Sequence, residues 1–63
     1  MHLSVFDLAG HFIPTIDFRI FSHETGEVYD TLPVFEICKL PSVYRDIMVM
    51  DWALRPDYVE VMI

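Results

Sequence analysis

Side chains alternate with a period of two along the C-terminal segment 46–63, and this alternation constrains the fold more than any other feature. A period of two is the signature of a β-strand, and two such runs separated by a short polar stretch are typical of a hairpin. The segment therefore predicts a β-hairpin that supplies most of the core. The residues expected on its apolar face are Met48, Met50, Trp52, Leu54, Val59, Val61 and Ile63.

The turn of this hairpin also fixes its register. Residues 55–58, Arg-Pro-Asp-Tyr, suit a four-residue type I turn, because Pro56 presets the backbone angle required at its position. A slip of one residue would invert every side chain and mix the two faces. The expected facing pairs are Leu54 with Val59, Trp52 with Val61, and Met50 with Ile63. This register directs Trp52 into the core.

A helix over residues 42–54 is the alternative to the first arm of this hairpin. Ser42 would be its N-cap and Pro56 would stop it. One helical face would then hold Val43, Ile47, Met50 and Leu54. Asp51 interrupts that face. We therefore favour the strand, and the helix remains the alternative to the fourth strand.

A second hairpin is expected in the first half of the chain. Residues 15–22 alternate cleanly, the turn 23–26 contains Gly26, and residues 27–30 return as a short strand. Gly26 is expected to take a left-handed conformation, which would place Phe21 opposite Tyr29. The segment 1–8 is expected to form a first, short strand.

Residues 31–40 favour a short helix, because Pro33 is tolerated in a first helical turn and Pro41 ends a helix. The sum over residues 1–63 is one small α+β domain. Its expected order is strand, strand, strand, helix, strand, strand, with the helix on one face of an antiparallel sheet built from two hairpins.

The size of the chain predicts self-association. A domain of 63 residues buries only about 60% of its unfolded surface, and the single cysteine, Cys38, cannot form an internal disulfide. Hydrophobic residues make up 54% of the chain, more than one thin layer hides easily. We expect an exposed apolar patch that serves as a dimer or partner interface, and the strand ending at Ile63 is expected to offer a free edge.

The charge of the chain points to the class of partner. Ten acidic residues against four basic ones give a net charge of −6, which disfavours direct contact with a nucleic-acid backbone. It suits a partner with a basic surface, such as a nucleic-acid-binding protein. No apolar run approaches the length of a membrane span, and a lone thiol is typical of the reducing cytosol, so a cytoplasmic location is expected.

No constellation in the sequence indicates catalysis, a cofactor or a metal site. The three histidines, His2, His11 and His23, lack the close spacings typical of metal ligands. The serines lie in no nucleophile motif, and two glycines cannot form a glycine-rich phosphate loop. We therefore expect a protein that is not an enzyme. A small-ligand or metal-binding domain that uses the histidines is the hypothesis from another class.

The expected outer face of the sheet is the candidate partner-binding surface. It combines carboxylates with aromatic side chains, so it would suit a basic groove on another protein. Its candidate residues are Asp17, Phe21, Glu27, Tyr29, Asp51, Tyr58, Glu60 and Met62. We expect the protein to act as a small acidic inhibitor or adaptor that docks on a larger protein and associates with itself. A structural subunit of a larger assembly is the further alternative.

Overall fold

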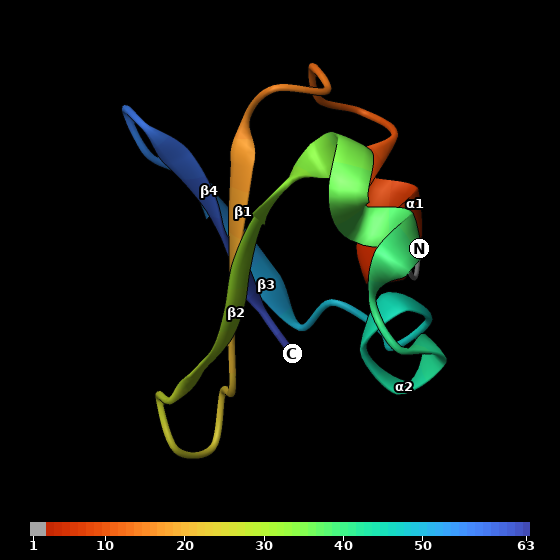
Figure 1. The fold of residues 1–63 in the computed structure, drawn as a ribbon. Helices are drawn as coiled ribbons and strands as arrows, with labels where there is room; N and C mark the ends of the chain where they lie inside the picture. Colours follow the sequence, from red (N-terminus) through yellow and green to blue (C-terminus); the bar gives the residue numbers. More distant parts are fainter. Residues whose placement is uncertain (1–2) are drawn as a thin grey trace.

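The computed structural model describes residues 3–63 and consists of two layers, a four-stranded sheet and a layer of short helices. All the helical segments lie on the same side of the sheet, as Figure 1 shows. The elements, in chain order, are α1 (Val5–Ala9), β1 (Asp17–Phe21), β2 (Val28–Pro33), the 3₁₀ helix η1 (Val34–Lys39), α2 (Ser42–Arg45), β3 (Asp51–Leu54) and β4 (Tyr58–Met62).

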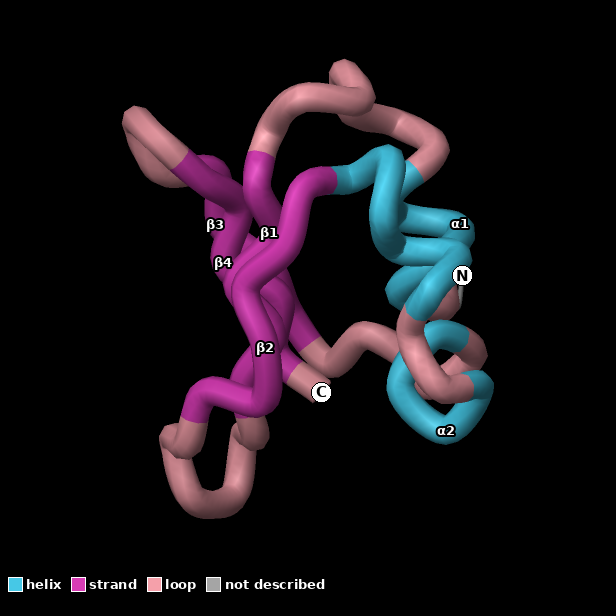
Figure 2. The backbone as a smooth tube through the Cα atoms, viewed as in Figure 1, coloured by secondary structure: helices cyan, strands magenta, loops and turns pink. Residues whose placement is uncertain are grey.

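The strand order in the sheet is β2-β1-β4-β3, and the sheet is mixed. The α+β class and the two hairpins are confirmed. The prediction of a purely antiparallel sheet was wrong, because the two hairpins meet through the parallel pair β1 and β4. The helical layer carries the chain from the end of β2 back to the opposite end of the sheet, as the tube in Figure 2 shows. As a result β3 runs in the direction of β2, and β4 runs in the direction of β1.

The C-terminal hairpin has the predicted register. Leu54 faces Val59 and Trp52 faces Val61, so the strand hypothesis is confirmed for residues 51–54. The helical alternative holds only for one turn, α2, which begins at Ser42 and ends at Arg45. The strand that ends this hairpin is not an edge, since β4 pairs with β1 on one side and β3 on the other.

The first hairpin forms where it was predicted, with one change of register. Gly26 has a φ of 76°, the left-handed conformation that the turn requires. A bulge shifts the pairing so that Phe21 faces Val28, not Tyr29. Tyr29 packs instead on Tyr44 of α2, with ring centroids 5.1 Å apart. The predicted aromatic pair is therefore wrong, because the bulge turns Tyr29 toward the helical layer.

Residues 5–9 form helix α1, so the predicted first strand is wrong for the described part of 1–8; residues 1 and 2 lie outside the described residues. A capping box begins this helix. The backbone N–H of Asp7 donates to Ser4 Oγ at 3.0 Å, and the N–H of Ser4 donates to Asp7 Oδ2 at 3.3 Å. Val5 and Leu8, one helical turn apart, then face the core together.

The helix predicted over 31–40 is present in a shorter and tighter form. Thr31 to Pro33 continue β2, and Pro33 precedes the 3₁₀ helix η1, in which Ile37 is buried. The backbone N–H of Val34 donates to the carbonyl of Ile16 at 2.9 Å. This bond keeps residues 31–33 in the sheet, so the helix begins three residues later than predicted.

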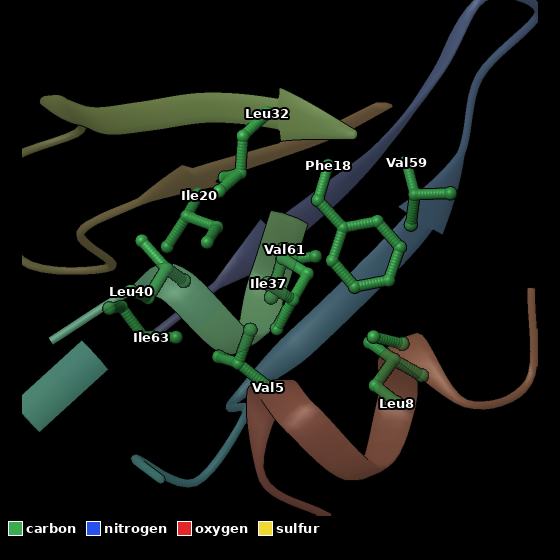
Figure 3. Close-up of a cluster of buried hydrophobic side chains, with 11 residues drawn as sticks. Val5, Leu8, Phe18, Ile20, Leu32, Ile37, Leu40, Val59, Val61 and Ile63 are labelled. Atoms are coloured by element: carbon green, nitrogen blue, oxygen red, sulfur yellow. The ribbon is translucent and has the colours of Figure 1, made fainter. Parts of the chain in front are cut away.

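The core lies between the two layers. Phe18 and Ile20 of β1 and Val59 and Val61 of β4 are almost fully buried, and Leu8 covers them from α1 (Figure 3). The remaining buried apolar residues are Val5, Ala9, Leu32, Ile37, Leu40 and Ile63. The two central strands thus supply the sheet side of the core, the helical segments supply much of the rest, and the outer face of the sheet has no helix over it.

Candidate functional site

Most of the residues predicted for partner binding do share the outer face of the sheet. The pairing of the strands places Asp17 beside Tyr58 and Phe21 beside Met62 on that face. Asp51 and Glu60 lie on the same face, opposite Met62 and Ala53 in the β3–β4 ladder. Two predicted residues lie elsewhere: Glu27 is in the β1–β2 connection, and Tyr29 faces the helices.

The charges on this outer face largely compensate one another. Arg55 Nη2 donates to Glu60 Oε2 at 3.0 Å, and the Tyr58 hydroxyl donates to Glu60 Oε1 at 3.3 Å. The hydrogen bond to Glu60 raises the pKa of Arg55. The guanidinium of Arg19 lies 4.3 Å from the centroid of the Tyr58 ring, a cation–π contact. The outer face is therefore an organised polar surface with two arginines in it, rather than a patch of uncompensated negative charge.

Trp52 lies on the opposite face, and its environment differs from the predicted one. It belongs to the apolar face of β3, as the alternation indicated, but 46% of it is exposed, so its placement in the core was wrong. Its ring packs edge-on against Phe12, with centroids 5.6 Å apart, and Phe12 packs edge-on against the buried Phe18 at 5.5 Å. This aromatic series connects the core to the surface at Trp52.

A groove opens beside Trp52, because the helical layer does not reach over β3. One hollow of about 430 Å³ is lined by Leu3, Leu8, His11, Phe12 and Trp52. A second, of about 230 Å³, shares Leu3, Leu8 and Trp52 and adds Val49, Met50 and Asp51. We name the two together the Trp52 groove, defined by Leu3, Leu8, His11, Phe12, Val49, Met50, Asp51 and Trp52.

The first hollow of the Trp52 groove is lined mainly by apolar surface, and the second, beside Asp51, exposes more polar than apolar surface. Within residues 3–63, only His11 and Asp51 among the lining residues carry a titratable side chain. Met50, just before β3, and Leu54, at its end, are each 63% exposed. Such a surface has little to offer a reacting group, but it suits the burial of an apolar side chain from a partner.

The segments that form the groove come from opposite ends of the chain. The N–H of Val49 donates to the carbonyl of Leu3 at 2.8 Å, and the N–H of Val5 donates to the carbonyl of Ile47 at 3.1 Å. These bonds hold the approach to β3 against the start of α1. Sequence reasoning identified Trp52 and Met50 as apolar-face residues but missed Leu3 and Phe12, since no local pattern indicates a contact between residues about forty apart.

The hydrogen-bonded polar side chains do not gather into a metal site. In the part of the chain that the structure describes, residues 3–63, no three His, Cys, Asp or Glu side chains are placed to hold a metal ion. His11 lines the groove, whereas His23 Nδ1 hydrogen-bonds the carbonyl oxygen of Ile63 at 2.8 Å. His2, the third histidine of the metal hypothesis, lies outside the described residues.

A scan against protein-family models, a search of curated proteins and a search of solved structures found no match to this chain. Among the described residues, no helix is long and apolar enough to cross a membrane. The candidate site is therefore defined by the geometry of the chain itself.

Proposed function

We propose that this protein is a non-enzymatic interaction module, an inhibitor or adaptor that docks on a larger protein through the Trp52 groove. The observation that carries the proposal is an apolar hollow of about 430 Å³ beside an exposed tryptophan. Tryptophan is among the residues most enriched at the energetic centres of protein interfaces. The groove thereby replaces the outer face of the sheet as the main contact surface.

The construction of the groove supports this role. Trp52 packs edge-on against Phe12 in the free protein, and a contact of this kind reduces the side-chain freedom that binding would otherwise cost. Water in an apolar hollow makes poor hydrogen bonds, and its displacement by an apolar side chain favours association. A leucine, methionine or phenylalanine of the partner has a suitable size and chemistry.

The charge of this protein indicates which residues should surround the apolar side chain on the partner. The protein carries a net charge of −6, and Asp51 lies in the margin of the groove. A partner surface with lysine or arginine beside its apolar anchor would be attracted at long range by this net negative charge. This complementarity supports a basic partner.

The proposal places the protein in the cytosol. Cys38 is its only cysteine and is exposed as a free thiol, which is typical of a reducing compartment. The lining of the groove holds neither a nucleophile beside a base nor a pair of facing carboxylates, which supports binding rather than catalysis.

Selection of peptides from a phage-displayed library tests the proposal without knowledge of the natural partner. We expect enriched peptides to share one large apolar residue flanked by lysine or arginine. Trp52 is the only tryptophan in the chain, so its fluorescence reports directly on the groove. Binding of a synthetic copy of such a peptide is expected to shift the emission of Trp52 to shorter wavelength.

The variants Trp52→Ala and Phe35→Ala form a matched pair for this experiment. Both remove an aromatic side chain that is about half exposed, but Phe35 lies on η1, outside the groove. Loss of Trp52 is expected to weaken peptide binding by at least about tenfold, as at an interface centre, while loss of Phe35 leaves it unchanged. Equal affinities for the two variants, measured by calorimetry, would contradict the proposal.

A further inference from the structure

The two edges of the sheet differ in their capacity to pair with another strand. On β2 the N–H of Thr31 points away from β1 and is occupied by Asp30 Oδ1 at 2.8 Å. Pro33, the next residue of that edge, has no N–H, and the bulge at Tyr29 interrupts the ladder. The β2 edge from Thr31 to Pro33 therefore offers no free donor to a new strand.

The β3 edge retains such groups. The N–H of Arg55 donates to the carbonyl of Tyr58 at 2.8 Å, which makes these two residues a hydrogen-bonded pair of the antiparallel ladder. Because hydrogen-bonded and non-hydrogen-bonded pairs alternate, the backbone groups of Trp52 and Leu54 point away from β4. The N–H of Trp52 is held by Asp51 Oδ1 at 2.8 Å. The N–H of Leu54 and the carbonyls of Trp52 and Leu54 face the open edge.

The side chains along this edge are complementary to themselves in the antiparallel direction. The segment reads Asp-Trp-Ala-Leu-Arg from 51 to 55, with Ala53 at its centre. Reversal about Ala53 exchanges Asp51 with Arg55 and Trp52 with Leu54. Acid then meets base, and apolar meets apolar, on each of the two faces.

We propose that two copies of this chain form a symmetric dimer by antiparallel pairing of their β3 strands about Ala53. This proposal goes beyond the docking of a partner in the groove, because the molecule that binds is a second copy of the chain and it binds at the edge of β3. Each Leu54 N–H donates to the Trp52 carbonyl of the second copy. The two sheets join into one continuous sheet with the helical layers on the same side.

The outer face of the joined sheet contains the charge pairs. Asp51 of each copy lies opposite Arg55 of the other, and the two Ala53 side chains are small enough for the strands to approach closely. On the inner face each Trp52 lies opposite Leu54 of the second copy, and both residues are exposed in the single copy. The pairing thus covers part of the most exposed apolar strand in the molecule.

Two contacts within the single copy oppose the dimer and make it weak. Asp51 accepts the N–H of Trp52, and Arg55 donates to Glu60 at 3.0 Å. When two copies pair, Asp51 and Arg55 must share these partners or exchange them for each other. The net charge of −6 on each copy adds repulsion, which salt screens. The dimer is therefore expected at high protein concentration and moderate ionic strength.

Complementary charge reversal tests the register directly. Asp51→Arg places two arginines opposite each other at both ends of the paired strands, and Arg55→Asp places two aspartates there. Each variant alone is expected to lose at least about tenfold in self-association, since like charges in facing positions repel. An equimolar mixture restores acid opposite base at both ends, and its association constant is expected to return to within about threefold of the unaltered protein.

The matched control is the pair Asp17→Arg and Arg19→Asp. These residues lie on the same outer face but on the interior strand β1, and they change the net charge by the same amounts. Mixing this pair is expected to produce no gain in association. Sedimentation equilibrium over two orders of magnitude in concentration provides the association constants, and circular dichroism confirms that each variant is folded.

Leu54→Lys is a second variant that leaves the fold intact, because Leu54 is already 63% exposed. A lysine on an edge strand opposes pairing, so this variant is expected to stay monomeric. An unaltered protein that remains monomeric at the highest concentration overturns the proposal, as does a dimer that Leu54→Lys leaves unchanged. Recovery in the Asp17/Arg19 mixture as large as in the Asp51/Arg55 mixture also overturns it. None of these results bears on peptide binding in the groove, which is measured on dilute protein.

Discussion

Trp52 and Asp51 are adjacent residues whose side chains leave β3 on opposite faces, and together they define how this protein meets other molecules. Trp52 presents an ordered aromatic surface in the groove, because Phe12 supports it. Asp51 occupies the N–H of its own neighbour at the strand edge. A short acidic side chain at this position limits pairing with foreign strands while the groove beside it stays open.

The capping box at Ser4 is a residue-level feature with a measurable effect. Ser4→Ala removes the acceptor for the N–H of Asp7, and loss of such a cap typically costs about 1 kcal/mol. We expect a corresponding decrease in the free energy of unfolding in urea. Ser42→Ala is the control, since the start of α2 has no side-chain cap and its stability should not change. A larger loss in Ser42→Ala than in Ser4→Ala would contradict this assignment.

Residue patterns predicted the faces of the strands but not how far each face is covered. Alternation correctly separated Trp52, Leu54, Val59 and Val61 from Asp51, Ala53 and Glu60, because the direction of a side chain follows from its own strand. Coverage depends on the helical layer, which comes from distant segments. Val59 is therefore buried while Trp52, on the same face, is half exposed.

At the scale of the elements, the turns carried the most reliable information. The turn at 55–58 set the register of β3 and β4, and Gly26 set the position of the first hairpin. Residues 5–8 were misassigned to a strand because the capping box Ser4-x-x-Asp7 was missed among apolar residues that also suit a strand. No local sequence pattern predicts the bulge at Tyr29, because the ring of Tyr29 packs on Tyr44, which comes from the distant helix α2.

The two glycines give an element-level prediction with an internal control. Gly26 has a positive φ and no atom within 4 Å of an added Cβ, so Gly26→Ala meets only conformational strain. We expect a loss of about 1 kcal/mol in unfolding free energy. Gly10 has a φ of −64° at the end of α1, so Gly10→Ala should be neutral or stabilising by about 0.5 kcal/mol. Thermal and urea denaturation measure both, and equal effects would show that backbone conformation does not decide the outcome.

At the scale of the whole molecule, the parallel pairing of β1 with β4 was beyond the reach of sequence patterns. Each hairpin is closed by its own turn, but their mutual direction depends on the path of residues 34–50 through the helical layer. The same path leaves β3 at an edge and uncovered. Part of the predicted outer-face cluster does lie on the outer face, because the alternation of side chains along a strand is enough to place it there. These residues are Asp17, Phe21, Asp51, Tyr58, Glu60 and Met62.

The whole molecule is thus asymmetric, with a groove and an open edge on the β3 side and a blocked edge on the β2 side. This asymmetry unites the two proposals, since a partner in the groove and a second copy at the edge both contact the short strand β3 that the helical layer leaves uncovered. A small sheet with one thin helical layer cannot cover all of its apolar face. What it leaves uncovered is the surface that we propose for binding.

The most direct test of the groove is the map of amide chemical shifts in ¹⁵N-labelled protein as a selected peptide is added. We expect the changes to concentrate at Leu3, Leu8, Phe12 and the segment 49–52, while the amides of Asp17, Arg19 and Tyr58 remain in place. Changes centred on the outer-face residues, with the groove unaffected, would contradict the groove as the binding surface and return that role to the outer face of the sheet.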